Sequence, residues 1–335
     1  MTIPASKAPA VSAGARYFSL IADKLGRTEE VFRQALASDV PFIEEAGEYI
    51  FSGGGKRMRP ALLLLAAQML ERDGDEEVTY AAVIELIHSA TLIHDDIIDH
   101  ATLRRSRPTV NKVWGNSKTV LLGDWLYTTA MNMALSHGNL AVVKRLCEAT
   151  LRMTEGELLA LDRLGAIDLT SDEYFSIIER KTARLFAAAA SVPALMAPAH
   201  QDAAAALSAY GRALGTCFQL VDDLLDFTAR ETELGKPVLS DLKEGKLTLP
   251  LLLALPRIDD RRRSWIAAVL EDGAFARVGP EQIVEVVEAE GTLDETRELA
   301  QSYAEEARKQ LASFPPSEAR DALEFAPDFV LHRRH

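Results

Sequence analysis

Two acidic clusters in apolar surroundings are the residues of this chain best suited to do chemistry. They are Asp95, Asp96 and Asp99 in LIHDDIIDH, and Asp222, Asp223 and Asp226 in QLVDDLLDF. Because residues four apart share one face of a helix, the first and last aspartates of each cluster are expected to project side by side. Like charges one turn apart repel, and carboxylates are ligands that suit Mg²⁺. Each pair therefore predicts a cation site.

Mg²⁺ usually keeps several waters and completes its shell with substrate phosphate. The two clusters together predict a site where several Mg²⁺ ions hold a phosphorylated substrate between two acidic helix faces. A solvated helix face is the alternative for either cluster taken alone. Two copies in hydrophobic helical settings favour the metal-binding interpretation.

An anionic substrate also needs positive charge, whereas the formal net charge of the chain is −13. This balance argues against nucleic acid as a partner and requires a local reversal of charge. GGGKRMRP supplies one, because Lys56, Arg57 and Arg59 follow three glycines and precede an apolar helix that opens at Pro60. Glycine lets the backbone approach a ligand, and a helix N-terminus adds partial positive charge. The segment predicts a phosphate cradle, with an ordinary basic loop as the alternative.

Other cations follow the acidic clusters or lie between them. They are Arg104, Arg105, Arg107, Lys181, Lys236 and Lys246. Taken singly, the arginines could simply neutralise the nearby aspartates, and each lysine would be a surface residue by default.

The elements that must position these residues are predicted to be helices. Apolar residues recur at three-and-four spacing over 76–98, 140–164, 171–191 and 202–227, with abundant Ala. Thr170 or Ser171 is a suitable N-cap, and 241–246 (DLKEGK) predicts a mobile charged loop before a helix near Pro250. The expected fold is all-α, one large helical bundle over residues 1–335 with a disordered tail at about 1–13.

Length and composition limit the class of protein. The chain has 335 residues, 48% of them hydrophobic, and no apolar run near the roughly 20 residues of a membrane span. The N-terminus lacks the apolar stretch of a secretory signal. Cys147 and Cys217 each lie in an apolar helical pattern, which predicts buried thiols in a reducing compartment. A cytoplasmic protein without a transmembrane segment is expected.

In their order, the motifs resemble those of the trans-polyprenyl diphosphate synthases, closest in pattern to the long-chain octaprenyl and decaprenyl types. The matching segments, within about 53–252, are GGGKRMRP, LIHDDIIDHATLRRSRPTVN, KTARLF, FQLVDDLLD and LGKPVLSDLKEGKLTLP. The resemblance implies an isoprenoid synthase fold, a homodimer, and head-to-tail (1'-4) condensation of isopentenyl diphosphate with an allylic prenyl diphosphate. It also implies Mg²⁺ as cofactor, about three ions per site, with Mn²⁺ as the alternative ion.

Roles for individual residues follow from the same resemblance. The implied metal ligands are Asp95, Asp96, Asp99, Asp222 and Asp226, within motifs that also include Asp223. Isopentenyl diphosphate would be held by Lys56, Arg59, His88 and Arg105, and the allylic diphosphate by Arg104, Lys181, Lys236 and Lys246. Thr182 and Gln219 would line the site near the reacting carbons. The catalytic set is Asp95, Asp96, Asp99, Lys181, Asp222 and Lys236.

Four positions depart from the family pattern or stand outside it. Ser106 replaces the glycine that usually follows the paired arginines, and Leu239 stands where a glycine is common after the second motif. Neither removes a ligand, but both leave loop mobility open. The C-terminal Arg333 and Arg334 are expected to form a solvated tail, with closure over the site as the alternative.

The chemistry follows from the leaving group. A diphosphate leaves readily only when its charge is neutralised, which is the work of metal ions and basic side chains. The double bond of isopentenyl diphosphate would attack the resulting allylic cation, and the released diphosphate would take the final proton. The protein must hold both substrates in near-attack geometry and exclude water.

Product length depends on the path of the growing tail. From Asp95 it should pass Ala90 and Thr91, which are both small, toward a helix that carries Trp125, Met131 and Met133. The first motif also lacks the two-residue insertion that the resemblance associates with bacterial short-chain enzymes. Both features predict a product longer than geranylgeranyl (C20). Close helix packing is the alternative reason for the small residues.

Other functions remain as alternatives. A farnesyl or geranylgeranyl synthase would make shorter products. A class I terpene cyclase would carry an Asn/Ser/Glu second motif, and a head-to-head synthase such as squalene synthase would not need the basic cradle. A non-catalytic subunit of a heteromeric synthase would have lost ligands, and this sequence has lost none.

Overall fold

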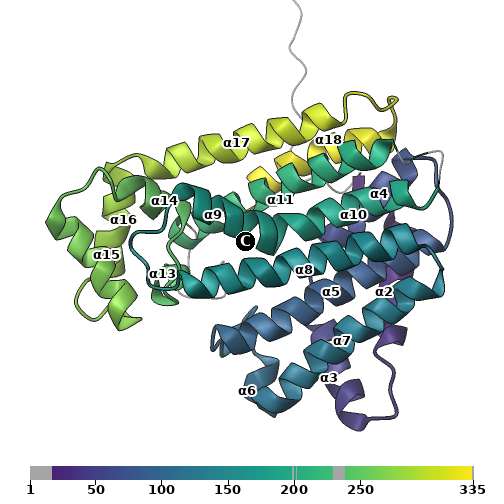
Figure 1. The fold of residues 1–335 in the computed structure, drawn as a ribbon, viewed down its shortest axis with the longest axis horizontal. Coiled ribbons are helices and arrows are strands. Elements are labelled where there is room, and N and C mark those ends of the chain that lie inside the picture. The colour runs from purple at the N-terminus through teal and green to yellow at the C-terminus, as the bar shows by residue number, and fades with distance from the viewer. Residues whose placement is uncertain (1–16, 198–199, 201, 229–237, 334–335) are drawn as a thin grey trace, which may run out of the picture.

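The structure is a computed structural model that describes residues 17–197, 200, 202–228 and 238–333. The predicted all-α class is confirmed, and helices dominate the described part of the chain (Figure 1). The elements are α2 Ala22–Ala35, α3 Pro41–Ser52, α4 Met58–Met69, α5 Glu76–Ile98, β1 Leu103–Arg104, β2 Arg107–Pro108, α6 Val110–Trp114, α7 Asn116–Ser136, α8 Leu140–Asp162, α9 Ser171–Ile178, η1 Glu179–Ala183, α10 Arg184–Leu195, α11 Ala203–Thr228, α13 Ser240–Lys243, α14 Leu249–Ala254, α15 Asp260–Asp272, α16 Pro280–Ala289, α17 Thr292–Gln310 and α18 Glu318–Leu331. The expected tail at 1–13 lies outside the described residues.

Local sequence signals account for several helix starts. The Asn139 side chain accepts hydrogen bonds from two backbone N–H groups at the start of α8. The predicted N-cap at Thr170 is confirmed, and with Glu173 it forms a reciprocal capping box. The bounds of α5 agree with the predicted 76–98, and those of α11 agree to within one residue at each end.

Two element predictions are wrong. The stretch 171–191 is not one α-helix, because a π-helical turn, η1, separates α9 from α10. Gly156 of α8 lies against this turn, where an added Cβ would come within 2.8 Å of the Lys181 backbone nitrogen. The predicted loop at 241–246 is partly helical, since α13 occupies Ser240–Lys243.

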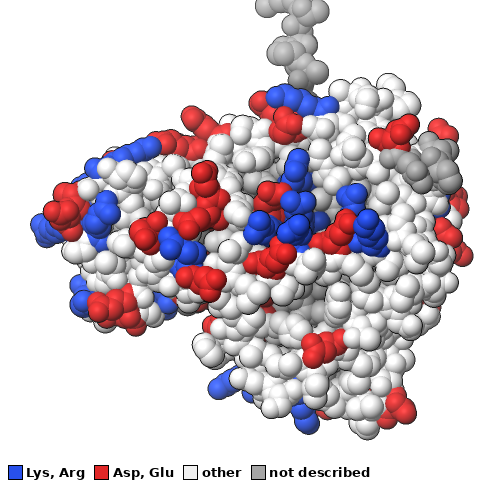
Figure 2. Space-filling model, viewed as in Figure 1, with Lys and Arg blue, Asp and Glu red and all other residues white. Residues whose placement is uncertain are grey.

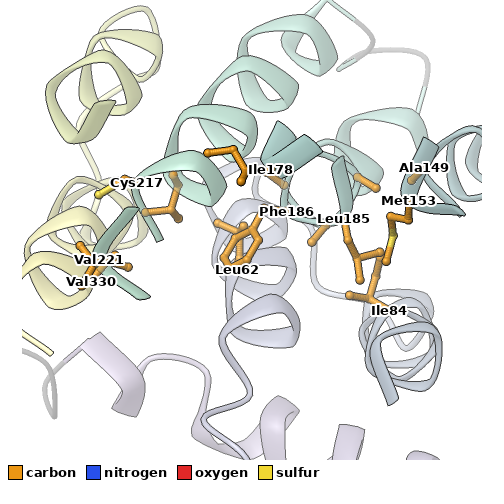
Figure 3. Packing of buried hydrophobic residues seen from close by; sticks show 14 of the residues in the cluster. Leu62, Ile84, Ala149, Met153, Ile178, Leu185, Phe186, Cys217, Val221 and Val330 are labelled. Carbon is orange, nitrogen blue, oxygen red and sulfur yellow. The ribbon is translucent and has the colours of Figure 1, made fainter. Parts of the chain in front are cut away.

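The core is built where α10 packs between α4 and α11, while α17 lies along α11 at the top of the view (Figure 1). Figure 3 shows Phe186 of α10 beside Leu62 of α4. Gly215 of α11 allows a close approach, because a Cβ there would lie 2.7 Å from the Ala183 Cα. This tight packing fixes the position of η1 relative to α11.

Helices α7 and α8 lie on the near face of the molecule, where much of the surface is uncharged (Figure 2). Both carry exposed leucines. Cys147 of α8 is exposed, so its predicted burial is wrong, whereas Cys217 is buried as predicted. The apolar pattern around Cys147 belongs to a helix face that no described residue covers. Within the described residues, we find no helix both long and apolar enough to cross a membrane.

Candidate active site

The first acidic motif lies at the C-terminal end of α5 and faces two lysines. The Lys181 Nζ of η1 is 3.8 Å from an Asp95 carboxylate oxygen and also contacts Glu157 of α8. The Lys246 Nζ lies 2.8 Å from Asp99. Burial raises the pKa of Asp95 to about 6, against the opposing effect of Lys181. The two lysines therefore stand at the first and last carboxylates of this motif.

Asp96 has a different partner. Arg104, in the short β1–β2 hairpin, donates a 2.8 Å hydrogen bond from Nε to the Asp96 carboxylate. Burial still raises the pKa of Asp96, and Arg104 lowers it. In this structure Arg104 neutralises a nearby aspartate. This is the alternative that the sequence left open for the arginines after the first motif.

In the second motif, Asp223 is buried inside a hydrogen-bond network. The Tyr174 hydroxyl and the Gln219 amide both donate to its carboxylate, the latter at 2.9 Å. The Thr182 hydroxyl donates to the Gln219 carbonyl oxygen at 2.8 Å. Burial raises the pKa of Asp223 to about 8, and nearby Asp241 adds to the shift. This network ties η1 and α9 to α11.

Asp226 is also buried, with 2% of the residue exposed, and its carboxylate holds the start of α13. It accepts hydrogen bonds from the Ser240 backbone N–H at 3.1 Å, the Ser240 hydroxyl at 2.9 Å and the Asp241 backbone N–H at 3.2 Å. These contacts explain why the segment after the second motif forms a helical turn.

Asp222 is the more open carboxylate of the second motif, and 50% of its side chain is exposed. Arg333, just beyond α18, lies 2.7 Å from it and stacks over Phe218. Only 6% of the Arg333 side chain is exposed, so the expected solvated tail is wrong for this residue. The end of α18 brings it against α11, a contact between residues far apart in sequence. Arg334 lies outside the described residues.

The basic cradle contains Arg59, a cation that Glu85 offsets only in part. Arg59 stacks over Phe186 at 4.5 Å, and its buried Nε has no hydrogen-bond partner among the described residues. Burial lowers the pKa of Arg59 to about 10. It also lowers the pKa of Lys56, and Arg333 adds to that effect. A cation held this way is suited to an anionic ligand.

His88 lies on α5 near this cradle. Burial, then the positive charge of Arg59 and Arg105, lowers the pKa of His88 well below its ordinary value. The imidazole is therefore neutral at physiological pH. Arg105 donates to the Gly54 carbonyl oxygen, which joins the hairpin to the glycine loop.

Arg57, a cradle residue that received no binding role, is structural. It lies 2.6 Å from Glu85 and 3.3 Å from Glu29.

Both departures from the family pattern fall where glycine is favoured, because φ is 60° at Ser106 and 56° at Leu239.

The structure thus gathers two sets of residues. Asp95, Asp99, Lys181 and Lys246 form one set, and Asp222, Asp223, Gln219 and Thr182 lie on or against α11. Lys236 lies outside the described residues.

The two residues expected to set product length lie on α5. Ala90 is buried in the hydrophobic core, and the Thr91 hydroxyl donates to the His88 carbonyl oxygen. Sequence reasoning missed Tyr174 and Glu157, because single residues in long helices carry no motif.

The carboxylates suit a hard divalent cation by their chemistry. Among the described residues no three His, Cys, Asp or Glu side chains are already gathered as a metal-binding group. Mg²⁺ commonly takes one or two carboxylates plus waters and substrate phosphates, so separate acidic faces fit it. Burial of Asp95, which raises its pKa, also favours a cation at this carboxylate.

Known proteins share this arrangement. A family model for polyprenyl synthetase matches residues 40–287. The chain belongs to the polyprenyl synthetase family and is a prenyltransferase. The octaprenyl diphosphate synthase of Escherichia coli K12 is 41% identical over 91% of this chain and 94% of its own length. A short chain isoprenyl diphosphate synthase of Methanothermobacter thermautotrophicus is 35% identical over 92% and 95%.

A solved structure agrees with the fold. The polyprenyl synthase of Caulobacter crescentus, crystallised with calcium and isoprenyl diphosphate, superposes with a TM-score of 0.92 at 34% identity. The match covers 99% of this chain and 100% of that one. The family resemblance drawn from the motifs is confirmed, and the family assignment favours a synthase over a terpene cyclase.

Proposed function

We propose that this prenyltransferase condenses isopentenyl diphosphate head-to-tail with an allylic prenyl diphosphate. The observation that carries the proposal is the Arg59 Nε, buried without a hydrogen-bond partner among the described residues, beside neutral His88 and Lys56. A buried donor without a partner is costly unless an anion accepts a hydrogen bond from it. A diphosphate supplies that anion, and the two acidic motifs provide for the second substrate.

Asp95, Asp99 and Asp222 would hold Mg²⁺, and Asp96 and Asp226 belong to the same motifs. The ions would neutralise charge on the leaving diphosphate. Lys181 and Lys246 already stand at the carboxylates of the first motif, so their ammonium groups can turn to the same diphosphate when it binds. A cation aimed at the leaving group acts mainly in the transition state.

The remaining side chains position and shield the substrates. Lys56, Arg59 and Arg105 hold isopentenyl diphosphate with its double bond toward the allylic carbon. Thr182 and Gln219, joined by a hydrogen bond, line the space near the reacting carbons. As the allylic C–O bond breaks, the double bond attacks the cation, and the departing diphosphate accepts the proton lost from the new chain.

Kinetics with each substrate varied in turn tests this division. Arg59→Ala should mainly raise the KM for isopentenyl diphosphate, whereas Lys181→Ala should mainly lower kcat by impairing ionisation. Arg72→Ala, which removes an arginine paired with Glu77 away from the motifs, is the control for loss of charge. Equal effects of Arg59→Ala and Lys181→Ala on both substrates would contradict the division.

We also propose a product longer than geranylgeranyl. The octaprenyl enzyme of Escherichia coli is the relative with the higher identity, and Ala90 and Thr91 leave no aromatic side chain below Asp95. Incubation with Mg²⁺, isopentenyl diphosphate and starters of increasing length, followed by chromatography of the dephosphorylated products, measures the length. Ala90→Phe should shorten the product while leaving the first condensation active. An unchanged product from a folded Ala90→Phe variant would show that the tail does not pass this residue.

A second copy of the chain is the partner that we propose for the exposed face of α7 and α8. Leu140, Leu151 and Leu158 are 73%, 59% and 57% exposed, on the same face as Cys147. With Cys147 these leucines are spaced by seven, four and seven residues, which forms a stripe along α8 that is typical of a helix that packs on another. On α7, Leu121 is 67% exposed. A homodimer in the cytoplasm agrees with this stripe and with the two reduced cysteines.

Thiol labelling tests the homodimer without an activity assay. Cys147 should be protected in the native protein and should react after Leu158→Glu, which sedimentation should show to be monomeric. Buried Cys217 is the internal reference that stays unreactive in both. A native protein that sediments as a monomer with fully reactive Cys147 would contradict the proposed interface.

A further inference from the structure

A second basic site lies behind the active site, in a cavity of about 530 Å³ between α8, the η1–α10 junction and α11. Its polar lining comprises Arg145, Glu148, Arg152, Arg180, Arg184 and Ser208. Four arginines against one glutamate are a strong local excess of positive charge in a chain of net charge −13. Figure 2 shows Lys and Arg side chains gathered over α8 and the start of α10.

The positive charge in this cavity is balanced only in part, since Arg152 pairs with Glu155 at 2.6 Å. Arg145 donates to the hydroxyls of Ser191 and Ser208 at 3.2 and 3.0 Å, which orient its guanidinium without neutralising it. Arg180 forms no hydrogen bond or ion pair with any residue that the structure describes. Arg184 lies 2.7 Å from Glu179, yet its Nε is buried without a partner in the described part of the chain.

The size and chemistry of the cavity define its ligand. The volume falls within the roughly 300–1,000 Å³ of small-molecule sites. Guanidinium groups form paired, charge-assisted hydrogen bonds with phosphate oxygens, and several of them together favour a multiply charged anion. Ala187 and Ala188 add an apolar wall beside the arginines. We propose that the cavity binds a diphosphate group, outside the active site.

The cavity shares a wall with the active site. The π-helical turn η1 places Arg180 toward the cavity, while the next residue, Lys181, faces Asp95. Gly156 of α8 packs against both residues, so the turn has little room to shift. A diphosphate bound at Arg180 and Arg184 therefore sits directly behind the lysine of the first motif. Released inorganic diphosphate and the head group of a prenyl diphosphate both carry the required chemistry.

Calorimetric titration in excess chelator tests the site in the full-length protein and measures binding without catalysis, so its outcome is independent of the proposed reaction. The native chain should bind one more equivalent of inorganic diphosphate than the double variant Arg180→Gln/Arg184→Gln binds. Otherwise it should bind diphosphate at least about tenfold more tightly than that variant does. The control Arg261→Gln/Arg262→Gln removes the same charge from α15 and should bind as the native protein does. Arg59→Gln should retain the additional equivalent, because it alters only the active-site cradle.

Geranyl diphosphate in a parallel titration distinguishes the two sources. Tighter binding than inorganic diphosphate assigns the site to a prenyl diphosphate that also contacts the alanine wall, and weaker binding assigns it to the released product. Arg180→Gln alone, which removes no side-chain hydrogen bond or ion pair within the described residues, is the variant to use if the double variant does not fold. Unchanged stoichiometry and affinity in the cavity variants would overturn the proposal. It would also be overturned if these variants weakened only the homodimer, because the arginines would then bind acidic side chains of a second copy.

Discussion

The two aspartate motifs are nearly identical in sequence but differ in their surroundings. In the first, at the end of α5, Asp95 and Asp99 each face a lysine from another element. In the second, on α11, Asp223 and Asp226 are buried and accept hydrogen bonds from residues of the fold. Only Asp222 of that motif is half exposed, and Arg333 contacts it.

This difference separates ligand binding from structural support. Ion pairs with flexible lysine side chains can be exchanged for metal ions and a diphosphate at modest cost. Buried carboxylates that bind backbone N–H groups and hydroxyls cannot be removed without leaving those donors unpaired. We infer that the first motif acts mainly on substrate, whereas part of the second motif stabilises the loop and helix around the site.

The largest expected effect is on turnover. Asp95→Ala and Asp222→Ala should each lower kcat by roughly two to four orders of magnitude, because each removes a ligand for the leaving diphosphate. Neither should change the free energy of unfolding by more than about 1 kcal/mol, since both carboxylates are in exchangeable ion pairs. Steady-state kinetics and urea unfolding measure the two quantities. A stable Asp95→Ala variant with native kcat would contradict the inference that the first motif acts on substrate.

Asp226→Ala should instead show a large loss of stability. It leaves the Ser240 hydroxyl and two backbone N–H groups without their acceptor, at a cost of roughly 2–4 kcal/mol in the free energy of unfolding. Asp99→Ala is the matched control in the first motif and should cost about 1 kcal/mol or less. Equal losses of stability from the two variants, measured by urea unfolding, would contradict the structural role of Asp226.

A pH-dependent effect is expected at Asp223. Its pKa is raised from 3.8 to about 8, so between these values the folded, metal-free chain holds a proton that the unfolded chain releases. The free energy of unfolding should therefore fall as pH rises through this window. Asp223→Asn should remove that dependence, so its stability relative to the native protein should increase from pH 5 to pH 8. The control Asp162→Asn, at an exposed position of α8, should follow the native curve, and parallel curves for all three proteins would contradict the prediction.

The smallest expected effect is at the hairpin that follows the first motif. Ser106→Gly should raise the free energy of unfolding by about 0.5–1 kcal/mol, because the left-handed φ of 60° favours glycine. Ser264→Gly, at an exposed position within α15, should lower it by a similar amount. Thermal unfolding compares the two, and a destabilised Ser106→Gly variant would show that the serine side chain contributes more than backbone strain costs.

Local patterns predicted much of this molecule. Helical periodicity located α5 and α8, and the acidic residues after Thr170 predicted the N-cap there. The π-helical turn was not predicted, because it packs against Gly156 of a different helix, a contact that local spacing does not show. The burial of Cys147 was also wrong, since periodicity identifies an apolar face without showing what covers it.

The candidate site was likewise predictable only where local sequence decides the contacts. The motifs indicated which carboxylates and cations belong near one another, but their partners depend on long-range packing. The contact of Arg333 with Asp222 joins the C-terminal region to α11, and no spacing in the sequence signals it. The same is true of Tyr174, which reaches Asp223 from α9. Two motifs with the same spacing of aspartates therefore have different environments in the fold.

The most direct test of the account is the initial rate of isopentenyl diphosphate incorporation into an allylic starter, measured as a function of free Mg²⁺. Condensation should be absent in excess chelator and should return when Mg²⁺ is added back to the same sample. Asp95→Ala should need far more Mg²⁺ or stay inactive, because a metal ligand is missing. Full condensation activity in excess chelator would contradict the central claim that the carboxylates act through divalent cations.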